Sequence, residues 1–289
     1  MANGRPTTAA VTGAAGMLGQ EVCRAAPQWV TPICLTRAGG DLTVAAEARR
    51  ALHSARPEII IHCAAWTDVD GATRDPEAAW QANAVATEHV AEVAAELDAR
   101  LLYVSTDYVF SGADGPYVES DAPSPVNPYG ESKLAGERAV AELPTHLIVR
   151  TQWLYGPGGR NFVEAILEAA RQGRALRVVQ NEYGCPTYAP DLAGALWQLL
   201  EADARGVMHV VNQGACSRLE LAYAALAEAG LEDVKVTGIA SEQWPSPTRR
   251  PVNAVLASER LAEVGLAPLR PWRQALRDYV AVLRGRWQQ

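Results

Sequence analysis

Short apolar runs recur along the chain and alternate with segments of helical periodicity. The runs cover residues 9–11, 33–35, 59–63, 101–105, 147–150 and 208–211. Continuous apolar runs indicate strands buried on both faces, as in a parallel sheet covered by helices. Helical spacing of apolar positions predicts helices at 45–55, 78–98, 132–142, 162–172 and 190–201. The pattern predicts an α/β fold with a doubly wound parallel sheet of the Rossmann type.

Three segments interrupt this alternation. They are dense in glycine, proline and aromatic residues and cover 156–160, 180–187 and 244–251. Such composition is typical of loops, and we expect a second, smaller substrate-binding lobe. We assign the dinucleotide-binding domain to residues 1–155 and 188–225. The substrate-binding lobe, interleaved with it, is then formed by residues 156–187 and 226–289.

The first apolar run leads directly into a glycine-rich turn. Gly13, Gly16 and Gly19 are spaced as GxxGxxG and precede a helical segment. Glycines permit a tight turn and let a pyrophosphate approach the N–H groups at a helix start, where the helix dipole favours an anion. The spacing resembles that of the short-chain dehydrogenases/reductases, so we expect a dinucleotide cofactor. The alternative is a turn that only packs a helix against a strand.

A tyrosine and a lysine, Tyr129 and Lys133, are four positions apart and follow Thr106 along the chain. In a helix these two positions share a face, so the phenol and the ammonium could enter the same cleft. We expect the cation to lower the pKa of Tyr129 from about 10 toward neutrality, which would suit a proton donor. The Thr106 hydroxyl could hold the oxygen of a ketone that receives hydride. The alternative is a surface helix that carries tyrosine and lysine by chance.

Composition limits the classes of partner. The chain has 289 residues, 48% of them hydrophobic, and a net charge of −7, as expected of an ordinary globular enzyme. No lysine or arginine run favours nucleic acid, and no apolar stretch resembles a signal peptide or a membrane span, so we expect a cytoplasmic location. No metal-ligand spacing links the cysteines. We expect no metal site and five reduced thiols, at Cys23, Cys34, Cys63, Cys185 and Cys216.

Five motifs together resemble the dTDP-4-dehydrorhamnose reductase family over nearly the whole chain. They are VSTDYVF at 104–110, PYGESKLAGE at 128–137, RTQWLYG at 150–156, GCPT at 184–187 and RRPVN at 249–253. The resemblance implies an extended short-chain reductase that reduces the C4 ketone of a nucleotide-linked 4-keto-6-deoxyhexose with hydride from NADH or NADPH. The reaction expected first is that of dTDP-4-dehydro-L-rhamnose to dTDP-L-rhamnose.

The resemblance also implies roles for individual residues. Tyr129 would be the proton donor, Lys133 its partner and the holder of the nicotinamide ribose, and Thr106 the hydroxyl that orients the carbonyl. Cofactor contacts are implied or expected at strand ends and loops, at Gly13, Gly16, Met17, Leu18, Gly19, Asp41, Leu42, Ala64, Ala65, Trp66 and Thr67, besides Tyr129 and Lys133.

Substrate contacts are expected from Thr106, Asp107, Trp153 and Arg250. Arginine suits a diphosphate because its fork donates charge-assisted hydrogen bonds. Each has a simpler interpretation: Asp107 could cap a turn, Trp153 could be a core aromatic, and Arg250 could be a solvated loop charge.

Cofactor choice depends on the end of the second apolar run, which reads Leu35-Thr36-Arg37. An acidic residue at this point bonds the ribose hydroxyls of NAD, whereas an arginine accommodates the extra phosphate of NADP. Arg37 therefore favours NADPH slightly over NADH. The alternative is that Arg37 is only an exposed loop charge.

Departures from the family pattern leave the exact sugar open. Residues 66–73 (WTDVDGAT) differ from the family's usual loop, and Ala254 stands where a serine is usual. The alternatives are a deoxysugar ketoreductase of an antibiotic pathway, such as dihydrostreptose synthase, a nucleotide-sugar epimerase, and a non-catalytic NADP-binding regulatory subunit. Intact Thr106, Tyr129 and Lys133 argue against the last. The expected partner is a small-molecule nucleotide sugar, and a homodimer is possible.

Overall fold

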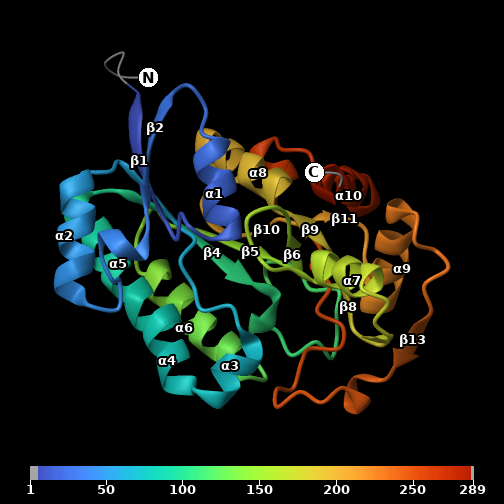
Figure 1. Ribbon diagram of the computed structural model, residues 1–289. Coiled ribbons are helices and arrows are strands. Elements are labelled where there is room, and N and C mark those ends of the chain that lie inside the picture. The colour runs from blue at the N-terminus through green and yellow to red at the C-terminus, as the bar shows by residue number, and fades with distance from the viewer. Residues whose placement is uncertain (1–5, 288–289) are drawn as a thin grey trace.

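The computed structural model describes residues 6–287, and its centre is a six-stranded sheet (Figure 1). The strands run in the order β10-β5-β4-β3-β1-β2, and every neighbouring pair is parallel. The predicted doubly wound α/β fold is confirmed. The strands are β1 (Thr7–Thr12), β2 (Val30–Leu35), β3 (Ile59–His62), β4 (Arg100–Thr106), β5 (Leu147–Thr151) and β10 (Gly206–His209).

Helices cover both faces of the sheet, because each parallel connection must cross back over it. Helices α1 (Met17–Arg24) and α8 (Ala189–Glu201) pack together on one face. The other face carries α2 (Ala45–Ala55), α5 (Ala86–Leu97) and α6 (Pro128–Ala141), with the short α3 (Val69–Arg74) and α4 (Pro76–Trp80) beside them. Within residues 6–287, no helix combines the length and the apolar character needed to cross a bilayer.

Two predicted helices have different bounds in the structure. The segment predicted at 78–98 is α4, a π-helical turn at Gln81–Val85 and α5. Helix α6 begins four residues before the predicted start, because the Asn127 side chain accepts a hydrogen bond from the Gly130 N–H and Pro128 occupies the first helical position. The early start brings Tyr129 into the same helix as Lys133.

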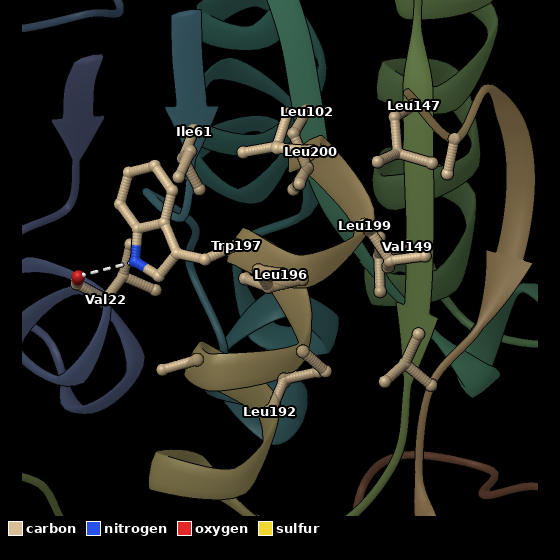
Figure 2. Packing of buried hydrophobic residues seen from close by; sticks show 14 of the residues in the cluster. Val22, Ile61, Leu102, Leu147, Val149, Leu192, Leu196, Trp197, Leu199 and Leu200 are labelled. Atoms are coloured by element: carbon tan, nitrogen blue, oxygen red, sulfur yellow. Dashed lines mark hydrogen bonds between the residues drawn. The ribbon is translucent and has the colours of Figure 1, made fainter. Parts of the chain in front are cut away.

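The larger core lies between the sheet and helix α8 (Figure 2). Leu192, Leu196 and Leu199 project from α8 toward the strands and are fully buried. The Trp197 indole donates a hydrogen bond of 3.0 Å to the Val22 carbonyl oxygen, which ties α8 to α1. This packing holds in place the helix whose start follows the glycine-rich turn.

A second core lies among three helices beyond the sheet, and the sequence had predicted only the first of them. They are α7 (Phe162–Arg171), α9 (Arg218–Ala229) and α10 (Trp272–Trp287). Short paired strands surround them: β6 (Leu154–Tyr155) with β9 (Thr187–Tyr188), β7 (Leu176–Val179) with β13 (Val236–Ile239), β8 (Tyr183–Gly184) with β12 (Cys216–Ser217), and β11 (Asn212–Gln213) with β14 (Leu269–Pro271).

The interleaving of the two cores follows the chain. Strand β10 returns to the main sheet, while α9 packs against α7 and α10 in the second core. The residues of α9 up to 225 had been assigned to the dinucleotide-binding domain, and their packing differs from that assignment. The domain boundaries themselves stay a prediction.

The prediction of five reduced cysteines was wrong. Cys23, near the end of α1, and Cys34, in β2, form a disulfide with their Cα atoms 6.4 Å apart. That separation lies in the usual range for such a bond. The pairing arises because β2 lies beside β1 and α1 packs against both, a contact that the spacing of cysteines along the chain does not reveal. Cys63, Cys185 and Cys216 are free thiols.

The core of α8 gives a stability prediction. Replacing fully buried Leu196 by alanine leaves a cavity between the helix and the sheet, and we expect it to lower the free energy of unfolding by about 2–5 kcal/mol. Val282→Ala, at a side chain on α10 that is 46% exposed, is the control and should change it little. Urea denaturation measures both variants. An equal decrease in the free energy of unfolding in the two would contradict this account of the core.

Candidate active site

The chemically active residues gather at the carboxyl ends of the strands. Gly13 follows β1, Thr106 ends β4, and Thr151 ends β5 directly beside Thr106 in the register. Strand β1 has β2 on one side and β3 on the other, so the strand order reverses there, where open α/β sheets bind ligands. A cavity of about 420 Å³ lies at this edge, lined by residues of the sheet, α1, α6 and the second core. We call it the central cavity.

The glycine-rich turn is shaped for close approach of a ligand. Gly13 has a φ of 67°, and a Cβ there would lie 2.6 Å from the Ala64 nitrogen. A Cβ on Gly19 would collide with the Gly13 carbonyl oxygen. Gly16 caps α1 without any side-chain hydrogen bond, so the first N–H groups of the helix are left for a ligand. With the central cavity in front of it, the turn fits the pyrophosphate of a dinucleotide.

A second cavity, of about 490 Å³, adjoins the turn on the β2 side. The predicted cofactor residues divide between the two cavities, and Gly13 and Ala65 line both. The central cavity is also lined by Gly16, Met17, Leu18, Gly19, Thr67, Tyr129 and Lys133. The second cavity is also lined by Arg37, Asp41, Leu42, Ala64 and Trp66. The structure thus brings all of the predicted cofactor residues to two adjoining cavities.

Arg37 is paired with a carboxylate at the mouth of the second cavity. Its Nη2 lies 2.7 Å from Asp41 Oδ2, and its side chain is 85% exposed. Hydrogen bonds from Thr43 and then from Arg37 lower the pKa of Asp41 to about 2, so the carboxylate is charged at neutral pH. An exposed pair of this kind contributes about 0–1 kcal/mol. Arg37 could therefore exchange Asp41 for a phosphate at little cost.

Helix α6 presents Tyr129 and Lys133 to the central cavity from its buried face. The Lys133 Nζ donates a hydrogen bond of 2.8 Å to the Val104 carbonyl oxygen and lies 4.1 Å from the centre of the Tyr103 ring. Thr106, at the end of β4, lines the same cavity as Tyr129. The three predicted catalytic groups therefore line one cavity.

The expected lowering of the Tyr129 pKa was wrong for this structure. Burial raises the pKa of Tyr129 above its usual range, and the neighbouring Thr106 side chain opposes only part of that rise. The Lys133 ammonium is directed to the Val104 carbonyl oxygen. Burial in turn lowers the pKa of Lys133 to about 7, partly opposed by the charge of Glu137. A phenol with a raised pKa keeps its proton at neutral pH, as a proton donor must.

Asp107 is more than the cap of a turn. Its carboxylate is buried and accepts hydrogen bonds from the Gln152 Nε2, at 2.8 Å, and from the Thr106 hydroxyl, at 3.0 Å. Burial raises its pKa to about 6. Asp107 lines the central cavity next to the catalytic threonine.

Trp153 forms a wall of the central cavity and is not enclosed in the core. Its φ of 46° is unusual for a bulky residue, and such backbone strain often lies at ligand sites. The Arg218 guanidinium lies 3.6 Å from the ring centre. The ring also packs so closely on Gly184 that a Cβ there would lie 2.6 Å from it. Arg218 and Gly184 thus fix the indole.

Arg250 is held in place, in contrast to a solvated loop charge. It donates hydrogen bonds to the Tyr108 hydroxyl, at 3.1 Å, and to the Asp70 carboxylate, at 2.9 Å. Asp70 lies in α3, so the 66–73 segment, expected to be a loop, is helical from Val69 onward. This segment therefore contacts a predicted substrate residue directly.

Several cavity residues escaped prediction. Thr151 and Gln152 follow the fifth apolar run, where the position at a strand end was a usable signal. The Thr151 hydroxyl is buried and has no hydrogen-bond partner in residues 6–287. Phe162 and Arg218 also line the cavity, from α7 and α9. Arg218 could not be found because α9 itself was not predicted. The described part of the chain has no cluster of three or more His, Cys, Asp or Glu residues that could hold a metal ion.

The family model described as the RmlD substrate binding domain matches residues 7–284. A dTDP-4-dehydrorhamnose reductase of Mycolicibacterium smegmatis is 41% identical over 281 residues, which is 95% of this chain and 85% of the relative. The chain belongs to this family of reductases.

Two further relatives widen the comparison. The dTDP-4-dehydrorhamnose reductase of Bacillus anthracis, solved in complex with NADP, superposes with a TM-score of 0.92 at 33% identity, covering 96% of this chain and 99% of that one. A dTDP-4-keto-6-deoxy-D-glucose reductase of Streptomyces niveus is 36% identical over 270 residues, 92% of this chain and 94% of its own. The resemblance to the dTDP-4-dehydrorhamnose reductase family drawn from the motifs is confirmed.

The geometry of Arg37 gives a prediction about the cofactor. If its guanidinium leaves Asp41 for the 2′-phosphate, Arg37→Ala should raise the KM for NADPH by roughly tenfold, the effect of a charge-assisted contact of about 1.5 kcal/mol. The KM for NADH should hardly change. Steady-state kinetics with both cofactors test this, and equal effects on the two would show that Arg37 is only a loop charge.

The packing of Gly184 against Trp153 gives a prediction about the substrate. A methyl group at residue 184 would collide with the Trp153 indole and with the Gln152 amide, so Gly184→Ala should raise the KM for the sugar nucleotide by roughly tenfold, the cost of one misplaced wall of a pocket. The affinity for NADPH should be unchanged. Gly173→Ala, where a Cβ meets nothing within 4 Å but φ is 67°, controls for the cost of alanine in a loop. A normal KM in a folded Gly184→Ala variant would contradict the role of Trp153.

Proposed function

We propose that this protein is an NAD(P)H-dependent reductase of the C4 ketone of a nucleotide-linked 4-keto-6-deoxyhexose. The first candidate is dTDP-4-dehydro-L-rhamnose, reduced to dTDP-L-rhamnose. One observation carries the proposal: Tyr129, Lys133 and Thr106 line the same cavity as the uncapped start of α1. Family membership supports it, since the relatives named above are reductases of dTDP-linked keto sugars.

The cofactor, NADPH or NADH with NADPH slightly favoured, supplies hydride when bound. Its pyrophosphate would be held by Gly16 and the N–H groups that follow it, and its adenosine end by the second cavity with Arg37. Lys133, beside the Val104 carbonyl oxygen, is placed to hold the nicotinamide ribose. The Bacillus anthracis relative was solved in complex with NADP, which supports a dinucleotide cofactor.

Proton supply follows from the state of Tyr129. As the ketone carbon receives hydride, negative charge develops on its oxygen, and a protonated phenol can neutralise it. Thr106 can donate a hydrogen bond to the same oxygen. In this structure the Thr106 hydroxyl donates its single proton to the Asp107 carboxylate at 3.0 Å, so it must turn away from Asp107 to donate to the ketone oxygen.

The nucleotide end of the substrate would lie in a third cavity of about 290 Å³, which shares Phe162, Arg218 and Arg250 with the central cavity. Two arginines at the junction suit a diphosphate, which accepts forked, charge-assisted hydrogen bonds. Beyond them the third cavity is lined by Trp244, whose side chain is 43% exposed, so its ring is free to stack on a base.

A second candidate differs only in the sugar. The 66–73 segment was expected to depart from the family pattern, and its Asp70, in α3, accepts a hydrogen bond from Arg250. A related deoxysugar ketoreductase is therefore the main alternative, and the Streptomyces niveus relative has a name of that kind. An epimerase or a regulatory NADP-binding subunit would show no net loss of NADPH. The cytoplasmic location and the homodimer remain predictions from the sequence.

The direct test is NADPH oxidation by the purified protein with a panel of 4-keto-6-deoxy sugar nucleotides. The proposal expects turnover with at least one dTDP-linked member, and the rate ratios across the panel identify the sugar. No turnover with any member, in a protein that binds NADPH, would contradict it.

Within that assay, Tyr129→Phe removes the proton donor and leaves the ring in place. We expect kcat to fall by at least about two decades, the usual contribution of a positioned acid, with NADPH affinity retained. Tyr223→Phe, at an exposed tyrosine on α9, is the matched control and should turn over like the wild type. Near-normal kcat in Tyr129→Phe would exclude the phenol as the acid.

A further inference from the structure

A buried ion pair lies behind the catalytic lysine. Glu137 is one helical turn beyond Lys133 on α6, and its side chain is only 5% exposed. Its Oε2 accepts a hydrogen bond of 2.7 Å from Arg150 Nη2, and its Oε1 accepts one of 2.9 Å from Arg150 Nε. Ser105 donates a further hydrogen bond of 2.5 Å to Oε1. The carboxylate is thus fixed by three donors.

These donors come from the strands that carry the active site. Ser105 precedes Thr106 on β4, and Arg150 lies directly opposite Ser105 on β5. Glu137 therefore joins α6 to the carboxyl ends of both strands at the level of the catalytic threonine. A shift of α6 along its axis would break all three hydrogen bonds.

The same carboxylate is the negative charge that acts on Lys133. Burial lowers the pKa of Lys133 to about 7, and among the groups that oppose this fall Glu137 has the largest effect. The lysine is otherwise surrounded by groups that are neutral at pH 7 or positively charged. Those facing or close to it are Tyr129 of its own helix, Tyr103 of β4, His62 and Cys63 at the end of β3, and Arg150 behind Glu137.

We propose that Glu137 is a positioning residue of the reaction: held by Arg150 and Ser105, its carboxylate fixes α6 on the strand ends and keeps Lys133 charged. Arg150 is needed because an unpaired carboxylate at this depth would be too costly to bury. The inference rests on the proposed function only through the role of Lys133 in holding the nicotinamide ribose.

The sign of the pH effect follows from the charge. Lys133 can hold the ribose through its ammonium below its pKa and loses that charge above it. Removing the negative charge of Glu137 disfavours the ammonium, so cofactor binding should weaken at a lower pH than in the wild type. Lys133 and Glu137 bind neighbouring residues of β4, Val104 and Ser105. A neighbouring opposite charge commonly shifts a pKa by about one unit or more, which sets the expected displacement.

The experiment is a titration of NADH affinity against pH, by fluorescence, for wild type and Glu137→Gln. NADH is the probe because it lacks the titrating 2′-phosphate. In the wild type, NADH affinity should fall as the pH rises past the pKa of Lys133; this fall is the alkaline limb of the titration. In Glu137→Gln the alkaline limb should lie about one pH unit lower. Glu131→Gln, at an exposed residue of the same helix, should leave it in place. An unmoved limb in a folded Glu137→Gln protein, with only its melting temperature lowered, would overturn the proposal and leave a purely structural pair.

Glu137→Gln leaves Arg150 buried without its counter-ion and could prevent folding. The double variant Glu137→Gln with Arg150→Met removes both charges and leaves no unpaired buried ion. Its alkaline limb should still move down, but by less than in Glu137→Gln, because the positive charge of Arg150 near Lys133 is lost as well. A wild-type limb in the double variant would equally overturn the proposal. Because the readout is cofactor binding, it stays interpretable even if no keto sugar is turned over, which is how failure of the proposed function would be recognised.

Discussion

The docking of helix α6 on the ends of β4 and β5 is the interaction on which the rest of the site depends. Asn127 starts the helix early enough to include Tyr129, and Glu137 fastens its middle to Arg150. Between these points Lys133 reaches the Val104 carbonyl oxygen. A parallel sheet with buried faces supplies the rigid edge that this arrangement needs. The proposed reaction then requires only that the dinucleotide and the sugar nucleotide meet at this edge.

The three adjoining cavities divide the recognition of those ligands. The cofactor side is built from backbone and small residues around Gly13 and Gly16, which suits the constant shape of a dinucleotide. The substrate side is built from side chains that hold one another: the Trp153 indole contacts both Gly184 and Arg218. A change at Asp70 in α3 can therefore alter sugar recognition through Arg250, whereas Trp66 and Thr67 line the two cavities assigned to the cofactor.

Much of this arrangement could be predicted from the sequence because it depends on local patterns. The glycine spacing, the apolar runs and the tyrosine–lysine separation each reflect one element and its immediate surroundings. The features that the sequence did not predict depend on contacts between segments that are distant along the chain. Arg218 enters the cavity from a helix that was not predicted, and Cys23 meets Cys34 only through packing of α1 against β2. The predicted lowering of the Tyr129 pKa was wrong for the same reason, because burial of the phenol depends on the whole site.

The central claim is that the residues at this strand edge direct hydride to the C4 carbon of a nucleotide-linked sugar while Tyr129 protonates its oxygen. The most direct measurement is turnover with NADPH deuterated at the transferring position of the nicotinamide, followed by NMR of the sugar product. The account predicts one deuterium at C4 of the sugar for each NADPH oxidised. Deuterium at another carbon, or a converted sugar without net oxidation of NADPH, would contradict it.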